Sequence, residues 1–107
     1  MNRFADLINS AEYYEAHEVM EEIWILNNRP RPSILQSLIQ IAASLEHVKR
    51  ENINGARALA MRALQDIQMV PNLPEEVWEW SSFLREFKQY AIGDFQGQPP
   101  ALQQAKS

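Results

Sequence analysis

Three residues near the start of the chain, His17, Glu18 and Glu21, combine side-chain types and spacings that can support chemistry. Imidazole and carboxylate groups both bind divalent metal ions, and both exchange protons near neutral pH when their surroundings favour it. On a helix, side chains four residues apart lie one turn apart on the same face, so His17 and Glu21 could reach one ion or one substrate. Glu18, which adjoins the histidine, is then a candidate general base.

A helical wheel over residues 12–25 divides the charged side chains of this segment into two groups. His17 and Glu21 fall in an otherwise apolar arc. The apolar members of the arc are Tyr13, Tyr14, Ala16, Met20, Ile23, Trp24 and Ile25. The opposite face carries Glu12, Glu15, Val19 and Glu22, with Glu18 on the border. Because a buried carboxylate without a partner is costly, we expect Glu21 to be buried beside a second histidine, a metal ion or donors from another helix.

The next segment contains candidates for that partner. Residues 32–45 contain no charged side chain, so the first part of a helix over 32–50 is predicted to be buried on most sides. One polar strip interrupts its apolar surface, and it consists of Gln36, Gln40, Ser44 and His47. If the strip faces the preceding helix, both histidines of the chain meet near Glu21. If it faces water, it is an ordinary polar surface.

The first interpretation of the cluster is a metal site. His17, Glu21 and His47 would bind a divalent metal ion, and the ion would lower the pKa of a bound water for hydrolysis, with Glu18 as the base. The supporting pocket would contain Tyr14, Trp24, Gln36 and Gln40. The pattern is not a zincin motif, because position 21 is Glu rather than His. Nor is it a di-iron motif, because Tyr14 and Ser44 stand where glutamates are needed.

The second interpretation is a non-catalytic helical module that binds another protein or a second copy of itself. Here the cluster is a buried polar network that determines how the helices meet. A third possibility, a small-molecule pocket without catalysis, differs from the first only in lacking turnover. The residues alone leave all three open.

Spacings of three and four between apolar residues predict an all-α fold, an antiparallel helical bundle of about five helices, four of them long and a short one at the N-terminus. The predicted helices cover residues 2–10, 12–27, 32–50 and 55–69, with a fifth that begins near Glu75 and ends before Gly93. Pro32 suits the first turn of the third helix, and Asn54 is expected to cap the fourth. The fifth is predicted to bury Val77, Trp80, Phe83, Leu84, Phe87 and Ala91.

One domain is predicted over residues 1–93, followed by a flexible tail over 94–107 with little to pack. The formal net charge of -4 and the lack of a basic stripe argue against nucleic-acid or membrane-surface partners. The absence of cysteine excludes disulfides and thiolate chemistry. With no membrane-spanning run and no signal peptide in its first residues, the chain is expected to be cytoplasmic.

Two segments, Tyr14–Trp24 and Leu35–Ala43, followed by His47 and by Asn54–Ala56, resemble the signature of domain-of-unknown-function family 309. In that family a His-Glu-x-x-Glu-x-x-Trp helix precedes a Gln-Gly-Leu-Ile-Gln-x-Ala-Ala helix, and the resemblance covers roughly residues 4–70. Ser37 departs from the pattern, since a glycine usually stands there, and it predicts wider helix spacing or an extra hydrogen bond. The resemblance implies an all-helical bundle and, from a label that family members carry, metal-dependent hydrolysis. The cluster it implies consists of His17, Glu18, Glu21, Trp24, Gln40 and His47.

Overall fold

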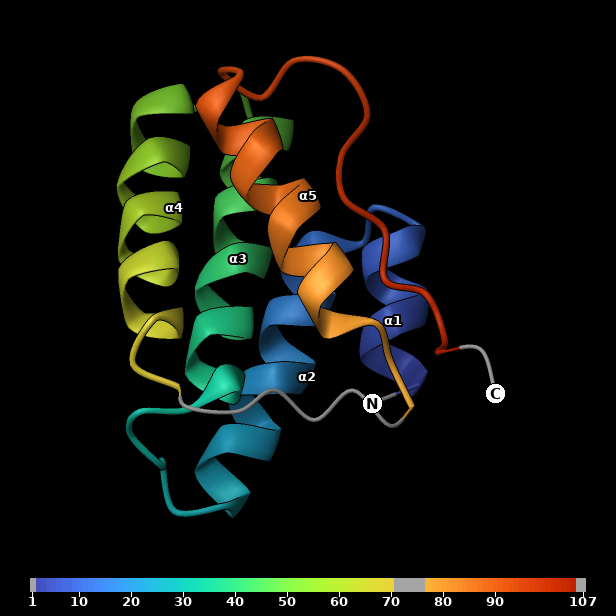
Figure 1. The fold of residues 1–107 in the computed structure, drawn as a ribbon, viewed down its shortest axis with the longest axis vertical. Coiled ribbons are helices and arrows are strands. Elements are labelled where there is room, and N and C mark those ends of the chain that lie inside the picture. The colour runs from blue at the N-terminus through green and yellow to red at the C-terminus, as the bar shows by residue number, and fades with distance from the viewer. Residues whose placement is uncertain (1, 71–76, 106–107) are drawn as a thin grey trace.

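A computed structural model describes residues 2–70 and 77–105 (Figure 1). Its helices are α1 (Asn2–Asn9), α2 (Tyr13–Leu26), α3 (Ile34–Lys49), α4 (Ile53–Ile67) and α5 (Trp80–Ile92). The all-α prediction is confirmed, and the first four predicted helices agree with the structure to within two residues at each end. Glu75, predicted in the first turn of the last helix, lies outside the described residues. No described helix is long and apolar enough to cross a membrane.

The helix α3 lies at the centre of the bundle, with α2 on one side and α4 on the other (Figure 1). α1 packs on α2, and α5 packs on α4. The largest fully buried apolar side chains come from four helices and from the C-terminal segment, and they are Phe4, Ile8, Met20, Leu38, Ile41, Leu45, Phe83, Phe87 and Leu102. Their burial removes much of the apolar surface of α1, α2, α3 and α5 from water, which is the main stabilising term in a bundle of this size.

Side-chain caps determine where α3 and α4 begin. The Ser33 hydroxyl accepts a hydrogen bond from the backbone N–H of Leu35, so α3 starts after Pro32 rather than at it. At α4 the cap is Asn52, whose Oδ1 accepts from the N–H of Gly55. The expectation that Asn54 caps this helix is therefore wrong. Asn52 stands one residue before the first helical position, where its oxygen reaches the third N–H.

Small side chains hold α3 and α4 close together. α4 presents Ala56, Ala60 and Ala63, all buried, and the Ser44 hydroxyl of α3 donates a 2.7 Å hydrogen bond to the carbonyl of Ala56. Ser37 is also fully buried on α3, but its hydroxyl has no hydrogen-bond partner. The serine at the usual glycine position thus supplies no extra hydrogen bond.

The end of the chain packs back onto the bundle, contrary to the expectation that residues 94–107 have little to pack. Phe95 and Leu102 are buried in the core, and the segment passes beside α1 (Figure 1). The Asn9 amide donates to the carbonyl of Leu102 and accepts from its N–H, both at 2.9 Å. The composition of residues 94–107 does not predict this packing, because the segment is rich in Gln and Pro and has few apolar residues. Two buried side chains, together with the hydrogen bonds from Asn9 to the backbone, are sufficient to hold the segment against the bundle.

The residues just before α5 form backbone hydrogen bonds with the same C-terminal segment. The Ala105 N–H donates to the carbonyl of Val77, and the Glu79 N–H donates to that of Gln103. Because residues 77–79 are hydrogen-bonded to the C-terminal segment, α5 begins only at Trp80. The side chain of Val77 is exposed, so its predicted burial is wrong.

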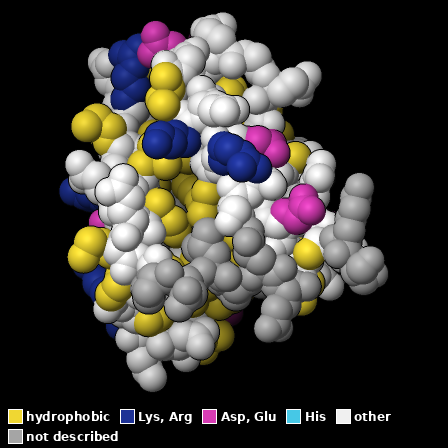
Figure 2. All heavy atoms as spheres, viewed as in Figure 1, with side chains coloured by type: hydrophobic (Ala, Val, Ile, Leu, Met, Phe, Trp, Pro, Cys, Tyr) yellow, Lys and Arg dark blue, Asp and Glu magenta, His cyan; other side chains and the backbone are white. Residues whose placement is uncertain are grey.

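A groove between α4 and α5 is lined almost entirely by apolar side chains. Figure 2 shows hydrophobic side chains gathered over these helices, with Lys and Arg side chains beside them. The lining residues are Arg57, Ala60, Met61, Leu64, Ala91, Ile92 and Phe95. Met61 and Ile92 are strongly exposed there.

A candidate ligand pocket between α2 and α3

The side chains of His17 and Glu21 meet on α2, with 3.4 Å between His17 Nε2 and Glu21 Oε2. The pair is not buried. The side chain of His17 is 28% exposed and that of Glu21 is 48% exposed. The predicted burial of Glu21 is therefore wrong, whereas His17 is partly covered and its Nδ1 atom is buried without a hydrogen-bond partner in the part of the chain that the structure describes. What remains is a surface pair that solvent and ligands can reach.

The way in which α2 is covered explains the difference. α2 packs mainly against α1 and α3, so part of its apolar arc stays open to solvent. Tyr14 is 52% exposed, and Ile25 and Leu26 are also exposed. A helical wheel shows which residues share an arc, but it does not show how much of that arc other helices cover.

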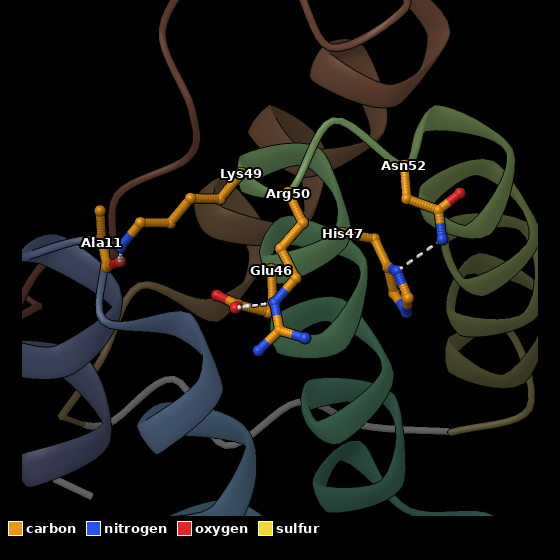
Figure 3. A network of polar contacts seen from close by, with 6 residues as sticks. All are labelled: Ala11, Glu46, His47, Lys49, Arg50 and Asn52. Carbon is orange, nitrogen blue, oxygen red and sulfur yellow. Dashed lines mark hydrogen bonds and ion pairs between the residues drawn. The ribbon is translucent and has the colours of Figure 1, made fainter.

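Three residues of the polar strip of α3 make their hydrogen bonds toward α4 and the turn before it, and they are Gln40, Ser44 and His47. Gln40 Nε2 donates to Asp66 Oδ2 at 3.0 Å, Ser44 donates to the backbone of Ala56, and Asn52 Nδ2 lies 3.0 Å from His47 Nδ1. Figure 3 shows the His47 ring turned toward Asn52 at the start of α4, with Arg50 and Glu46 in contact with each other beside it at the end of α3. The strip therefore does not bring two glutamines to Glu21.

Both histidines nevertheless line one pocket between α2 and α3. Its cavity volume is about 200 Å³. The lining residues are Tyr14, His17, Ala43, Glu46, His47 and Arg50. The predicted pocket residues Trp24, Gln36 and Gln40 are not among them. Trp24 instead donates to the carbonyl of Pro30 and lies under the guanidinium of Arg31, so it orders the connection to α3.

Tyr14 and Arg50 join the two walls of this pocket. The Tyr14 ring is stacked on that of His17, with centroids 6.3 Å apart, and the Arg50 guanidinium lies 5.9 Å from the Tyr14 centroid. Arg50 Nε also donates to Glu46 Oε2 at 2.7 Å (Figure 3). The guanidinium is thus held over the ring by an ion pair one turn away and by a cation–π contact.

Sequence reasoning missed Glu46 and Arg50 as pocket residues, because on this helix it considered only the polar strip that ends at His47. A signal was present, since positions 43, 46, 47 and 50 have the spacing of one helical face. Glu18 lies apart from the pocket. It lines exposed acidic surface with Glu21 and Glu22 on one side and with Glu15 and Glu22 on the other.

The described residues do not fit a resident metal ion. Nowhere in 2–70 and 77–105 do three His, Asp or Glu side chains come together to hold one. His17 and Glu21 supply two candidate ligand atoms 3.4 Å apart, and among the described residues no third His, Asp or Glu side chain joins them. Protein zinc sites use at least three side-chain ligands, so the pair alone is an incomplete site.

Comparison with known proteins supports the resemblance seen in the sequence. The family model described as "Domain of unknown function (DUF309)" matches residues 1–59. An uncharacterised protein, YpuF of Bacillus subtilis (strain 168), is 33% identical over 58 residues, which are 53% of this chain. The matched part is 33% of YpuF, so the chain spans about a third of that relative's length. No solved structure matches significantly.

Proposed function

Since the chain belongs to the DUF309 family, whose model spans every residue that lines the α2–α3 pocket, we propose that this pocket is the functional site and binds a small organic anion. The observation that carries the proposal is that Arg50 and both histidines, from two helices, line one solvent-reachable pocket beside the exposed Tyr14 ring. The apolar groove between α4 and α5 lies mostly outside the matched residues.

The chemistry of the lining favours a planar carboxylate. Within the described part of the chain, only Nε of the Arg50 guanidinium has a hydrogen-bond partner, Glu46. Its terminal amino groups can therefore donate two parallel hydrogen bonds to a carboxylate, a pairing that lysine cannot reproduce. The Tyr14 ring, which is 52% exposed beside Arg50, adds apolar aromatic surface for a ring-bearing ligand to contact. Glu46 offsets part of the charge of Arg50, so modest affinity is expected.

Benzoate, benzamide and benzamidine form a matched set of probes, because they have nearly the same shape and differ in charge. Each would be titrated into ¹⁵N-labelled protein while amide shifts are recorded. The proposal expects saturable shifts with benzoate that centre on Tyr14, His17 and Arg50, and weaker ones with benzamide. Stronger binding of benzamidine would mean that Glu46 dominates and that the ligand class is wrong.

Two variants locate the binding site on the surface. Arg50→Gln removes the guanidinium and should weaken benzoate binding by about tenfold or more, the usual effect of losing a charge-assisted hydrogen bond. Arg62→Gln makes the same change on the exposed face of α4, outside the pocket, and should leave binding unchanged. Equal losses in the two variants would indicate nonspecific attraction between benzoate and positive charge.

A second candidate function, association with another protein or with a second copy, draws support from the apolar groove between α4 and α5. Large exposed apolar side chains such as Met61 and Ile92 are typical of interaction surfaces when they cluster. Light scattering over a range of concentrations, with Met61→Lys as the comparison, tests self-association. A chain that stays monomeric at high concentration contradicts the homo-oligomer.

Metal-dependent hydrolysis stays a prediction. Its test is elemental analysis of protein purified without chelator, beside His17→Ala. Stoichiometric metal that is lost in the variant would support it.

A further inference from the structure

We propose that Asn52 is a positioning residue that makes His47 a hydrogen-bond donor to the ligand of the α2–α3 pocket. The identity of the ligand rests on the proposed function, but the state of His47 is a property of the protein without ligand. The two parts can therefore fail separately.

The cap of α4 sets the orientation of the Asn52 amide. The backbone N–H of Gly55 donates to Asn52 Oδ1 at 3.2 Å. A backbone N–H can only donate, so the oxygen of the amide must face Gly55. The amide nitrogen is consequently directed at His47, where Nδ2 lies 3.0 Å from Nδ1 (Figure 3).

That orientation determines the tautomer of His47. An amide NH₂ donates and does not accept, so Nδ1 of His47 must accept with its lone pair. A neutral imidazole carries one ring hydrogen, which is then on Nε2. Since Nδ1 is occupied by Asn52, the Nε2–H group is what the ring can offer to a ligand. The ligand must therefore present an acceptor to His47, as a carboxylate does.

Gly55 makes the close approach possible. A Cβ atom at this position would lie 2.7 Å from Asn52 Nδ2 and 3.1 Å from His47 Nδ1. The first distance is shorter than van der Waals contact allows, so any side chain here would push the amide away from the imidazole. His47, Asn52 and Gly55 thus form one hydrogen-bonded unit at the junction of α3 and α4.

The tautomer can be observed directly. Two-bond ¹H–¹⁵N correlations of the ring nitrogens would be recorded on the full chain at about pH 8, above the usual titration range of histidine. The proposal expects the Nε2–H tautomer for His47, with His17 as the second histidine in the same spectrum. A predominant Nδ1–H tautomer, or an even mixture, would overturn it.

Asn52→Asp is the decisive variant, because aspartate still caps Gly55 but presents a carboxylate oxygen to Nδ1. His47 should then change to the Nδ1–H tautomer. Asn54→Asp adds the same charge at an exposed position and should leave the tautomer unchanged. Asn52→Ser, which keeps a capping oxygen and removes the amide donor, should give a mixture and covers the case in which the aspartate variant does not fold.

Benzoate titration links the tautomer to binding. Asn52→Asp should bind benzoate about fivefold or more weakly than Asn54→Asp, because a donor toward the ligand is lost while the net charge is equal. Equal affinity in the two variants would overturn the role of Asn52 in binding. If His47 has the expected tautomer and the unaltered protein does not bind benzoate, the proposed function fails and the positioning of His47 by Asn52 is supported.

Discussion

Ser37 and Ser44 lie two turns apart on α3 and are both fully buried, but only the hydroxyl of Ser44 has a hydrogen-bond partner. A buried hydroxyl that lacks a partner keeps the full cost of losing its hydration, whereas one that donates to a carbonyl recovers most of it. The same residue type on the same helix is thus expected to have opposite effects on stability.

Replacement of each serine by alanine tests this difference. Ser37→Ala should raise the free energy of unfolding by about 1 kcal/mol, and Ser44→Ala should lower it by a similar amount. Helix propensity favours alanine equally in both variants, so the difference between their free energies of unfolding reports only the effect of the hydrogen bond. Urea unfolding measures it, and equal values for the two variants would contradict the expectation.

The His17–Glu21 pair is expected to contribute little to stability, because both side chains are partly exposed and solvent screens their attraction. A double-mutant cycle of His17→Ala and Glu21→Ala should give a coupling of about 0.5 kcal/mol or less. Chemical denaturation at low salt measures the coupling. A value of several kcal/mol would instead indicate the buried network that the sequence suggested.

Asn9 is expected to be important for stability despite its position at the end of a short helix. Asn9→Ala removes both hydrogen bonds to the backbone of Leu102 and should cost about 2 kcal/mol, near 1 kcal/mol for each. Leu102→Ala should cost about 2–4 kcal/mol through the cavity that it leaves. Gln103→Ala, whose side chain is exposed next to Leu102, is the matched control and should be neutral in thermal unfolding.

Alkaline pH should unfold the protein partly through Tyr13. Burial raises the pKa of Tyr13 above its ordinary value of 10.0, and a negative charge on Tyr90 raises it further. Burial also raises the pKa of Tyr90. Because the folded state favours the neutral phenol, the stabilising contribution is present below about pH 10 and is lost as the pH rises through the folded-state pKa.

Tyr13→Phe removes that titration, so its free energy of unfolding should fall less steeply above about pH 10 than that of the unaltered chain. Denaturation at several alkaline pH values, with tyrosinate absorbance recorded in parallel, measures the effect. Tyr14→Phe, at the exposed neighbouring position, provides the comparison. Parallel pH profiles for Tyr13→Phe and the unaltered chain would contradict the role of burial.

The helices were predictable because apolar spacing and the prolines act locally. The helix around Leu38 and Ile41, for example, needs only its own periodicity to be recognised. The surroundings of Glu21 were not predictable in that way. Its burial depends on whether a further helix covers one edge of α2, and no property of residues 12–25 determines that.

The pocket residues, too, could be predicted only where neighbouring residues in the sequence determine their positions. His17 was recognised from its type and its place on the wheel. The partner of His47 depends on how α4 begins, and the cap at Asn52 rather than Asn54 turns that ring toward α4. A shift of two residues in a predicted helix start is enough to change which side chains share a site.

The bonds between Asn9 and Leu102 join positions 93 residues apart in the chain. The contacts among α2, α3 and α4 connect neighbours in sequence, so the loops closed when these helices pair are short. Closing the far longer loop between α1 and the C-terminal segment costs more conformational entropy, and only contacts made at the end of that process offset it. The helices α2, α3 and α4 are therefore able to assemble as a local unit. The hydrogen bonds between Asn9 and Leu102 are expected to form late in folding and to break first in unfolding.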